Sequence, residues 1–132
     1  MVRVQGLDHI VLRSPDIERS LQFYSGVLGM DSVREDEWRE GKVRFPSVRL
    51  NEGTLIDLFP MGPDDVFSAT QQLVHFCIVL EPGELAVAKK AIKAAGIGIE
   101  IEATRWGARG DAESFYFQGP EGVQIELREY PA

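Results

Sequence analysis

The sequence has little cysteine, little histidine and no long apolar segment. Cys77 is the single cysteine, so no disulfide can form within the chain, and this is typical of a protein of the reducing cytoplasm. No stretch approaches the roughly 18 consecutive apolar residues of a membrane-spanning helix, and the first residues lack the apolar run of a signal peptide. We therefore expect a cytoplasmic protein with no membrane association.

Basic residues are also scarce, because 14 Lys and Arg stand against 21 Asp and Glu, for a formal net charge of −7. Proteins that bind nucleic acid usually carry a basic patch or stripe, so this balance predicts no nucleic-acid partner. The 132 residues suit one domain, and 44% hydrophobic with 27% charged residues is an ordinary globular composition. These values permit a hydrophobic core of useful size.

The only two histidines, His9 and His75, occupy matching places in an internal repeat. The segment LDHIVL aligns with LVHFCIVL when His9 is placed on His75, and GTLIDL aligns with GVQIEL when Asp57 is placed on Glu126. The two alignments differ in offset by a few residues only, which one loop insertion explains. Each half therefore begins with a histidine-bearing segment and ends with a carboxylate-bearing one.

Each half carries the pattern of a strand, a helix and three further strands. We expect strands at residues 7–13, 30–34, 43–50 and 54–59 with a helix at 17–28, then strands at 73–80, 98–102, 113–118 and 123–129 with a helix at 82–95. A segment rich in Gly, Pro, Asp and Ser separates the halves. The predicted class is α+β, as one domain with module one at 5–60, a linker at 61–70 and module two at 71–130.

Side-chain alternation along these strands predicts which residues share a face. On the last strand Glu126 and Arg128 point away from the apolar residues that should pack under the helix. His9 and His75 can each face the same side as the carboxylate of their own module. One face of each sheet is thus left to build a site.

Imidazole and carboxylate are good ligands for first-row divalent metals, and two histidines with one carboxylate leave open positions for a substrate or water. The sequence therefore predicts a metal site formed by His9, His75 and Glu126. Asp57 is a fourth candidate by symmetry, although its shorter side chain suits contact through water. Ni, Zn, Mn, Fe and Co all accept this ligand set. Glu126 is also the candidate catalytic base, because a carboxylate beside a reacting carbon can move a proton.

A second group of residues is predicted to contact the substrate. The segment TRWGARGD at 104–111 forms either a mobile lid over an anionic substrate or a solvated hairpin loop. Arg128 can act as a partner of Glu126, as a phosphate contact or as a surface salt bridge. The candidate substrate-binding residues are Arg105, Trp106, Arg109, Tyr116 and Arg128. Cys77 is interpreted as a packing residue.

The segments GLDHIVLRSPDIERSLQFYSGVLGM and FYFQGPEGVQIELRE resemble the vicinal oxygen chelate superfamily, which contains glyoxalases, bleomycin-resistance proteins and extradiol dioxygenases. The resemblance covers nearly the whole chain. It implies two βαβββ modules that form a cup-shaped mixed sheet with helices on the outer face. It also implies metal ligands at His9, Asp57, His75 and Glu126, and a homodimer in which one site can draw ligands from two chains.

The resemblance leaves several activities open. The favoured one is a glyoxalase-like lyase or isomerase in which a metal chelates vicinal oxygens of a small substrate during proton transfer. Alternatives are a fosfomycin-type addition of thiol or water to an epoxide, a ring-cleaving dioxygenase, and a non-catalytic antibiotic-binding protein with Trp38 or Trp106 lining an apolar cup. Asp57 departs from the Glu or His of glyoxalase I, and the lack of a third histidine disfavours a typical extradiol dioxygenase.

Overall fold

The computed structural model describes residues 3, 5, 7–62, 73 and 75–132, and it divides the chain into two compact units, Met1–Phe67 and Ser68–Ala132. We call these units module one and module two. Most of the predicted linker lies outside the described residues. Among the helices in the described ranges, none is long and apolar enough to cross a membrane.

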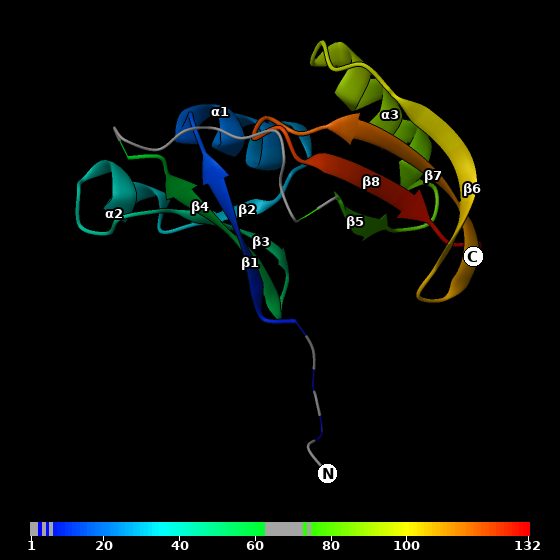
Figure 1. The fold of residues 1–132 in the computed structure, drawn as a ribbon, viewed down its shortest axis with the longest axis horizontal. Helices are drawn as coiled ribbons and strands as arrows, with labels where there is room; N and C mark the ends of the chain where they lie inside the picture. Colours follow the sequence, from blue (N-terminus) through cyan, green and yellow to red (C-terminus); the bar gives the residue numbers. More distant parts are fainter. Residues whose placement is uncertain (1–2, 4, 6, 63–72, 74) are drawn as a thin grey trace. The chain divides into compact units, whose positions relative to one another are not determined.

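Module one is a mixed sheet with the strand order β1-β4-β3-β2 (Figure 1). Its strands are β1 (His9–Ser14), β2 (Asp31–Val33), β3 (Ser47–Asn51) and β4 (Thr54–Pro60). Strands β1 and β4 are parallel, whereas the other neighbours are antiparallel. The parallel pair brings the start of the module beside its end, so residues far apart in the sequence become neighbours.

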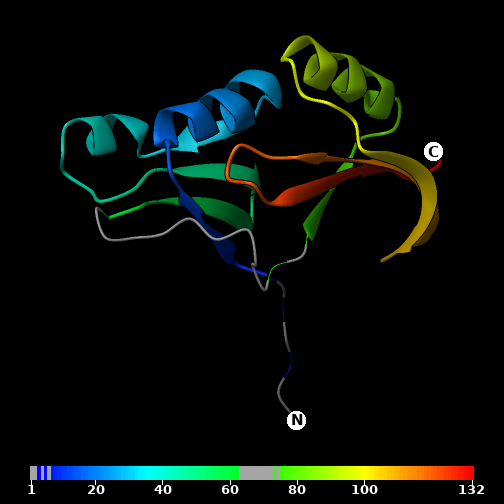
Figure 2. The same ribbon diagram turned by 45° about the horizontal axis from the view of Figure 1, so that its top comes forward.

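The helix of module one, α1 (Ile17–Leu21), contacts β4 and continues as a π-helical turn, η1 (Gln22–Val27). The Asp16 carboxylate caps α1 by accepting a hydrogen bond from the Arg19 backbone N–H at 3.1 Å. Figure 2 shows this helix over one face of the sheet. The core between them is formed by residues that the amphipathic pattern selects, namely Leu12, Ile17, Leu21, Tyr24, Val48, Ile56 and Leu58.

Module two repeats this architecture with the strand order β5-β8-β7-β6. Its elements are β5 (His75–Leu80), α3 (Glu84–Ala94), β6 (Ile101–Gly107), β7 (Gly110–Gln118) and β8 (Gln124–Glu129). Strands β5 and β8 are parallel, and α3 contacts β8 (Figures 1 and 2). The buried hydrophobic residues of module two include Ile78, Ile92, Phe115, Phe117, Ile125 and Leu127. The predicted α+β class with two βαβββ modules is therefore confirmed.

Three local predictions need correction. A short helix, α2 (Glu35–Arg39), occupies a segment for which no helix was expected. The strand expected at 43–50 begins only at Ser47, because Pro46 has no backbone N–H to join a ladder. The strand expected at 98–102 instead begins at Ile101 and extends to Gly107, and its partner begins at Gly110.

The turn between β7 and β8 provides a test of how tightly module two is packed. A β-carbon on Gly119 would lie 2.7 Å from Cδ1 of Ile125, a fully buried residue, and 3.3 Å from the Val123 carbonyl oxygen. We expect Gly119→Ala to lower the free energy of unfolding by roughly 1–3 kcal/mol, as overpacking does. Gly98→Ala is the matched control, because a β-carbon there meets nothing within 4 Å. Equal urea midpoints for the two variants would contradict this packing.

Candidate metal centre

His9 and Asp57 meet on the face of the module-one sheet that lies opposite the helix. The register of β1 and β4 pairs Val11 with Asp57, so alternation puts His9 on the same face as this carboxylate. Nε2 of His9 lies 3.8 Å from Oδ2 of Asp57. The Ser47 hydroxyl donates to Oδ1 of Asp57 at 2.6 Å, which leaves Oδ2 directed towards the imidazole.

The other ring nitrogen of His9 is held by its neighbour Asp8. Oδ2 of Asp8 lies 2.8 Å from Nδ1, and because a carboxylate can only accept, the imidazole donates from Nδ1. This hydrogen bond, followed by the charge of Asp57, raises the pKa of His9. In the neutral ring the lone pair is then on Nε2. A carboxylate behind a histidine in this way is the usual support of a metal-ligating imidazole.

His75 and Glu126 form the equivalent pair in module two. The register of β5 and β8 pairs Cys77 with Glu126, so His75 faces the same side as Glu126, as His9 does with Asp57. Nε2 of His75 lies 3.3 Å from Oε1 of Glu126. The Glu126 side chain is 6% exposed and that of His75 is 38% exposed, so the pair has a buried carboxylate and an accessible imidazole.

Tyr116 belongs to this pair through both its ring and its hydroxyl. Its ring packs edge-on against His75, with centroids 5.6 Å apart. Burial raises the pKa of Tyr116, and a hydrogen bond to Glu126 raises it further. Tyr116 stands opposite Glu126 on β7, as Ser47 stands opposite Asp57 on β3. Each carboxylate is therefore supported by a hydroxyl from the neighbouring antiparallel strand.

The structure thus brings the predicted ligands together as two pairs, one within each module. Among the described residues, no three His, Cys, Asp or Glu side chains cluster closely enough to hold a metal. One module alone supplies one imidazole and one carboxylate. A site with two histidines must therefore draw on both modules, from one chain or from two.

The predicted lid segment is a regular hairpin. Strands β6 and β7 pair as far as Gly107 with Gly110, so only residues 108 and 109 lie outside the strands. The register places Arg105 on the Glu126 face and Trp106 on the opposite face, where it is 82% exposed. The segment 104–111 therefore lies within a paired hairpin, because the cross-strand ladder continues through residues that resemble a loop in composition.

Arg128 and Arg109 are both anchored to the protein. Arg128 is 4% exposed and forms an ion pair with Glu126, so it is a partner of Glu126 and the surface salt-bridge interpretation is wrong. Arg109 donates its backbone N–H to the Tyr130 hydroxyl at 3.1 Å, and its guanidinium lies 4.3 Å from the centre of that ring.

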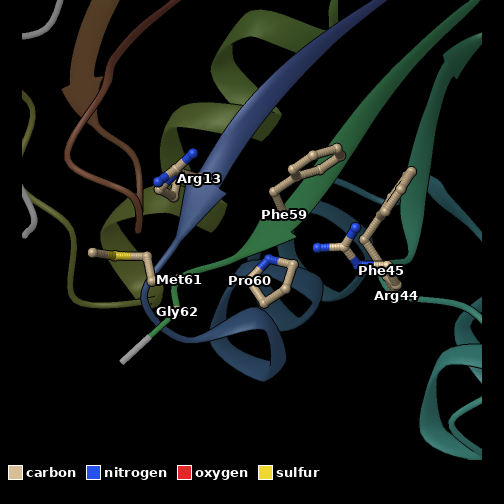
Figure 3. Close-up of a pocket in the computed structure, with 7 residues that line it drawn as sticks. All are labelled: Arg13, Arg44, Phe45, Phe59, Pro60, Met61 and Gly62. Atoms are coloured by element: carbon tan, nitrogen blue, oxygen red, sulfur yellow. The ribbon is translucent and has the colours of Figure 1, made fainter. Parts of the chain in front are cut away.

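A pocket of about 380 Å³ in module one was not predicted from the sequence. Its described lining residues are Arg13, Arg44, Phe45, Phe59, Pro60, Met61 and Gly62. In Figure 3, Arg13 and Met61 lie on one side of Phe59 and Pro60, with Arg44 and Phe45 on the other. Phe59 follows Asp57 by one same-face step of β4, about 7 Å along the strand. Alternation from His9 would have indicated Arg13, but nothing in the sequence indicated Arg44.

A second pocket in module one shares Arg44, Pro60 and Met61 with this pocket and adds Trp38 to its lining. Trp38 is partly buried beside the start of α1. The two tryptophans considered for an apolar cup therefore have different surroundings, since Trp106 is almost fully exposed.

The model of the glyoxalase/bleomycin resistance protein/dioxygenase superfamily matches residues 6–127, so the chain belongs to this superfamily. The integron cassette protein VCH_CASS1 of V. cholerae is 28% identical with a TM-score of 0.78, over 99% of both chains. Virulence protein STM3117 of Salmonella typhimurium is 25% identical over 96% of this chain and 85% of its own. The probable lactoylglutathione lyase of Vibrio parahaemolyticus is 27% identical, over 90% and 86%.

The surroundings of Cys77 make its thiol a poor nucleophile. Cys77 is an exposed residue, but partial burial of its sulfur, followed by the charge of the nearby Glu126 carboxylate, raises the pKa of its thiol to about 12. Because the thiolate is the reactive species, we expect iodoacetamide to label folded protein at pH 8 at least about 100-fold more slowly than it labels a small free thiol. Urea-unfolded protein is the control and should label at the ordinary rate. Equal rates before and after unfolding would contradict this environment.

Proposed function

We propose that the protein is a divalent-metal-dependent enzyme of the glyoxalase type, acting on a small substrate with two neighbouring oxygens. The observation that carries the proposal is the duplicated imidazole–carboxylate pair, which occupies equivalent strand positions in both modules. A surface histidine needs no carboxylate partner, so two imidazole–carboxylate pairs at the same strand register are better explained by a common function. Membership of the superfamily and the likeness to the lactoylglutathione lyase support an enzyme.

The donor atoms suit a first-row divalent ion. His9, His75 and Glu126 would hold it, with Asp57 as a fourth ligand directly or through water, and Ni, Zn, Mn, Fe and Co all accept such donors. The support of His9 by Asp8 and of Asp57 by Ser47 matches the outer hydrogen bonds that metal ligands usually have. When bound, the ion supplies polarisation of a carbonyl and stabilises the anion that proton removal creates.

Glu126 is the residue to which we assign proton transfer. Its carboxylate is buried, and Oε1 faces His75 on the open side of the sheet. A carboxylate in that place can take a proton from the carbon beside the substrate carbonyl and return it to the neighbouring carbon. Tyr116 holds the same carboxylate by a hydrogen bond, which limits its rotation. Asp57 has the corresponding place in module one.

The module-one pocket indicates the kind of substrate. Two guanidinium groups, Arg13 and Arg44, line a pocket otherwise formed by aromatic and apolar side chains, and its described lining contains no carboxylate. Arginine is the residue best suited to carboxylate and phosphate groups. We therefore assign to this pocket the anionic end of a substrate with an apolar body. Arg105, which faces the Glu126 side of module two, is a further candidate contact.

A homodimer and a cytoplasmic location belong to the same proposal. Val11, Val79 and Ile101 share the site faces of their sheets and are 45%, 48% and 41% exposed. Apolar side chains around a polar site are typical of a surface that a second chain covers. The single cysteine fits a reducing compartment.

Addition of a thiol or water to a phosphonate-bearing epoxide is the second candidate. The observation that favours it is again the arginine pair in the pocket, because a phosphonate satisfies two guanidinium groups. A ring-cleaving dioxygenase and a metal-free antibiotic-binding protein remain alternatives, although nothing in the described site favours either over the glyoxalase type.

The metal content of the purified protein tests the proposal. We expect wild type to take up about one divalent ion per chain. The double variant His9→Ala/His75→Ala should lose this ion, because each substitution removes one imidazole ligand. Glu52→Gln, an exposed carboxylate variant, is the control and should retain the ion. Assays with methylglyoxal hemithioacetal, fosfomycin plus thiols, and catechols then separate the reactions. A wild type that takes up no ion under any loading condition would refute the metalloenzyme.

The pocket is tested with phenylphosphonate as the probe. We expect the double variant Arg13→Met/Arg44→Met to weaken phenylphosphonate binding about tenfold or more, because charge-assisted hydrogen bonds to both guanidinium groups are lost. Saturation-transfer NMR measures the dissociation constants, and Arg19→Met, on the exposed side of α1, controls for net charge. If the double variant binds phenylphosphonate as tightly as wild type and Arg19→Met do, the pocket is not an anion site.

A further inference from the structure

Arg128 is buried on β8, one same-face step from Glu126. Its Nη2 lies 3.4 Å from Oε2 of Glu126 and donates to the Arg105 carbonyl at 2.7 Å. Nη1 donates to the Tyr130 hydroxyl at 2.9 Å, and Nε lies 3.4 Å from the Ser114 hydroxyl. The guanidinium thus contacts partners on β6, β7, β8 and the C-terminal segment, which fixes its plane. Lysine has no planar fork of N–H donors and could not reproduce these contacts.

The two carboxylate oxygens of Glu126 therefore have different partners. Oε2 is held by Arg128, whereas Oε1 lies 3.3 Å from Nε2 of His75. The terminal torsion of a glutamate is otherwise broad, so a carboxylate held by the Tyr116 hydroxyl alone could still exchange its oxygens and bind an ion through both. We propose that Arg128 is a positioning residue that holds Oε2 and presents Oε1 alone to the metal, a role that rests on the proposed function.

Module one lacks this arrangement at the equivalent position. The register that pairs Val79 with Arg128 in module two pairs Arg13 with Phe59 in module one. There the Asp57 carboxylate is held by the neutral Ser47 hydroxyl. The two halves of the site are therefore unequal. Each carboxylate is held by a neutral hydroxyl, and Glu126 has the Arg128 guanidinium in addition, which agrees with Glu126 as the principal carboxylate.

The same contacts give Arg128 a second consequence, because they tie the β6–β7 hairpin to Glu126. Arg128 holds the Arg105 carbonyl, and Tyr130 accepts hydrogen bonds from both Arg128 and the backbone of Arg109. Since its donors are directed at protein groups, Arg128 acts through Glu126 and does not contact the substrate. This argues against the substrate-binding role predicted for Arg128 from the sequence.

The positive charge of Arg128 and its contact with Glu126 have opposite effects on metal affinity. Removal of the charge alone would tighten metal binding, because the guanidinium repels a cation. Loss of the planar N–H fork would free the Glu126 carboxylate and weaken metal binding. Arg128→Lys keeps the charge without the fork, and Arg128→Met removes both. The positioning role predicts weaker binding in both variants.

The test measures the Co²⁺ dissociation constant of the full chain by calorimetry, with the visible Co²⁺ spectrum as a report on ligand geometry. We expect Arg128→Lys and Arg128→Met to weaken binding about 10–100-fold, as loss of groups that orient metal ligands does. Arg39→Met, which breaks ion pairs with Glu18 and Glu35, is the control and should leave affinity and spectrum unchanged. An Arg128→Met variant that is folded and binds Co²⁺ as tightly as wild type, or more tightly, would overturn the proposal.

A metal-free double-mutant cycle separates this proposal from the proposed function. Thermal unfolding of Arg128→Lys, Glu126→Gln and the combined variant should show strongly non-additive effects, because the two side chains are in contact. Additive effects would overturn the Arg128–Glu126 coupling whatever the metal result. Failure of wild type to take up Co²⁺ would instead refute the metalloenzyme itself.

Discussion

Two parallel strand pairs, β1 with β4 and β5 with β8, determine which side chains meet in the candidate site. In a βαβββ unit the first and last strands are neighbours, so residues from the two ends of the module stand side by side. The register then places an imidazole beside a carboxylate, as His9 with Asp57 and His75 with Glu126. A slip of one residue would turn either side chain to the helix-covered face, where an unpaired charge is costly. The hydrophobic cores therefore fix the chemistry of the opposite faces.

Positively charged side chains gather near the candidate site, although the chain as a whole is negatively charged. The protein has a net charge of −7, yet the described lining of the module-one pocket contains Arg13 and Arg44 and no carboxylate. In module two, Arg128 and Arg105 lie on the same face as Glu126. Under the proposed function, Arg13 and Arg44 in module one and Arg105 in module two are suited to hold a small anion, whereas the net negative charge of the chain repels anionic macromolecules.

Much of the fold and the candidate pairs could be predicted from the sequence, because both follow from periodicity. Alternation along 123–129 correctly placed Glu126 opposite the apolar core, and the alignment of the two halves correctly paired each histidine with a carboxylate. The environment of each side chain could not be predicted. Burial of Arg128 depends on partners from β6 and β7, and the Arg13–Arg44 pocket joins residues far apart in the sequence. The extent of the two strands around 104–111 was missed because Gly and Arg suggested a loop, whereas cross-strand pairing decides the conformation of this segment.

If one ion joins the two imidazole–carboxylate pairs, as proposed, anomalous diffraction from crystals soaked with Co²⁺ will locate it. We expect one strong anomalous peak per chain within bonding distance, about 2.0–2.3 Å, of Nε2 of His9, Nε2 of His75 and one oxygen of Glu126. The ligands can come from one chain or from two. A peak bound to the histidine of a single module, or one remote from both histidines, would refute a metal ion shared by the two pairs.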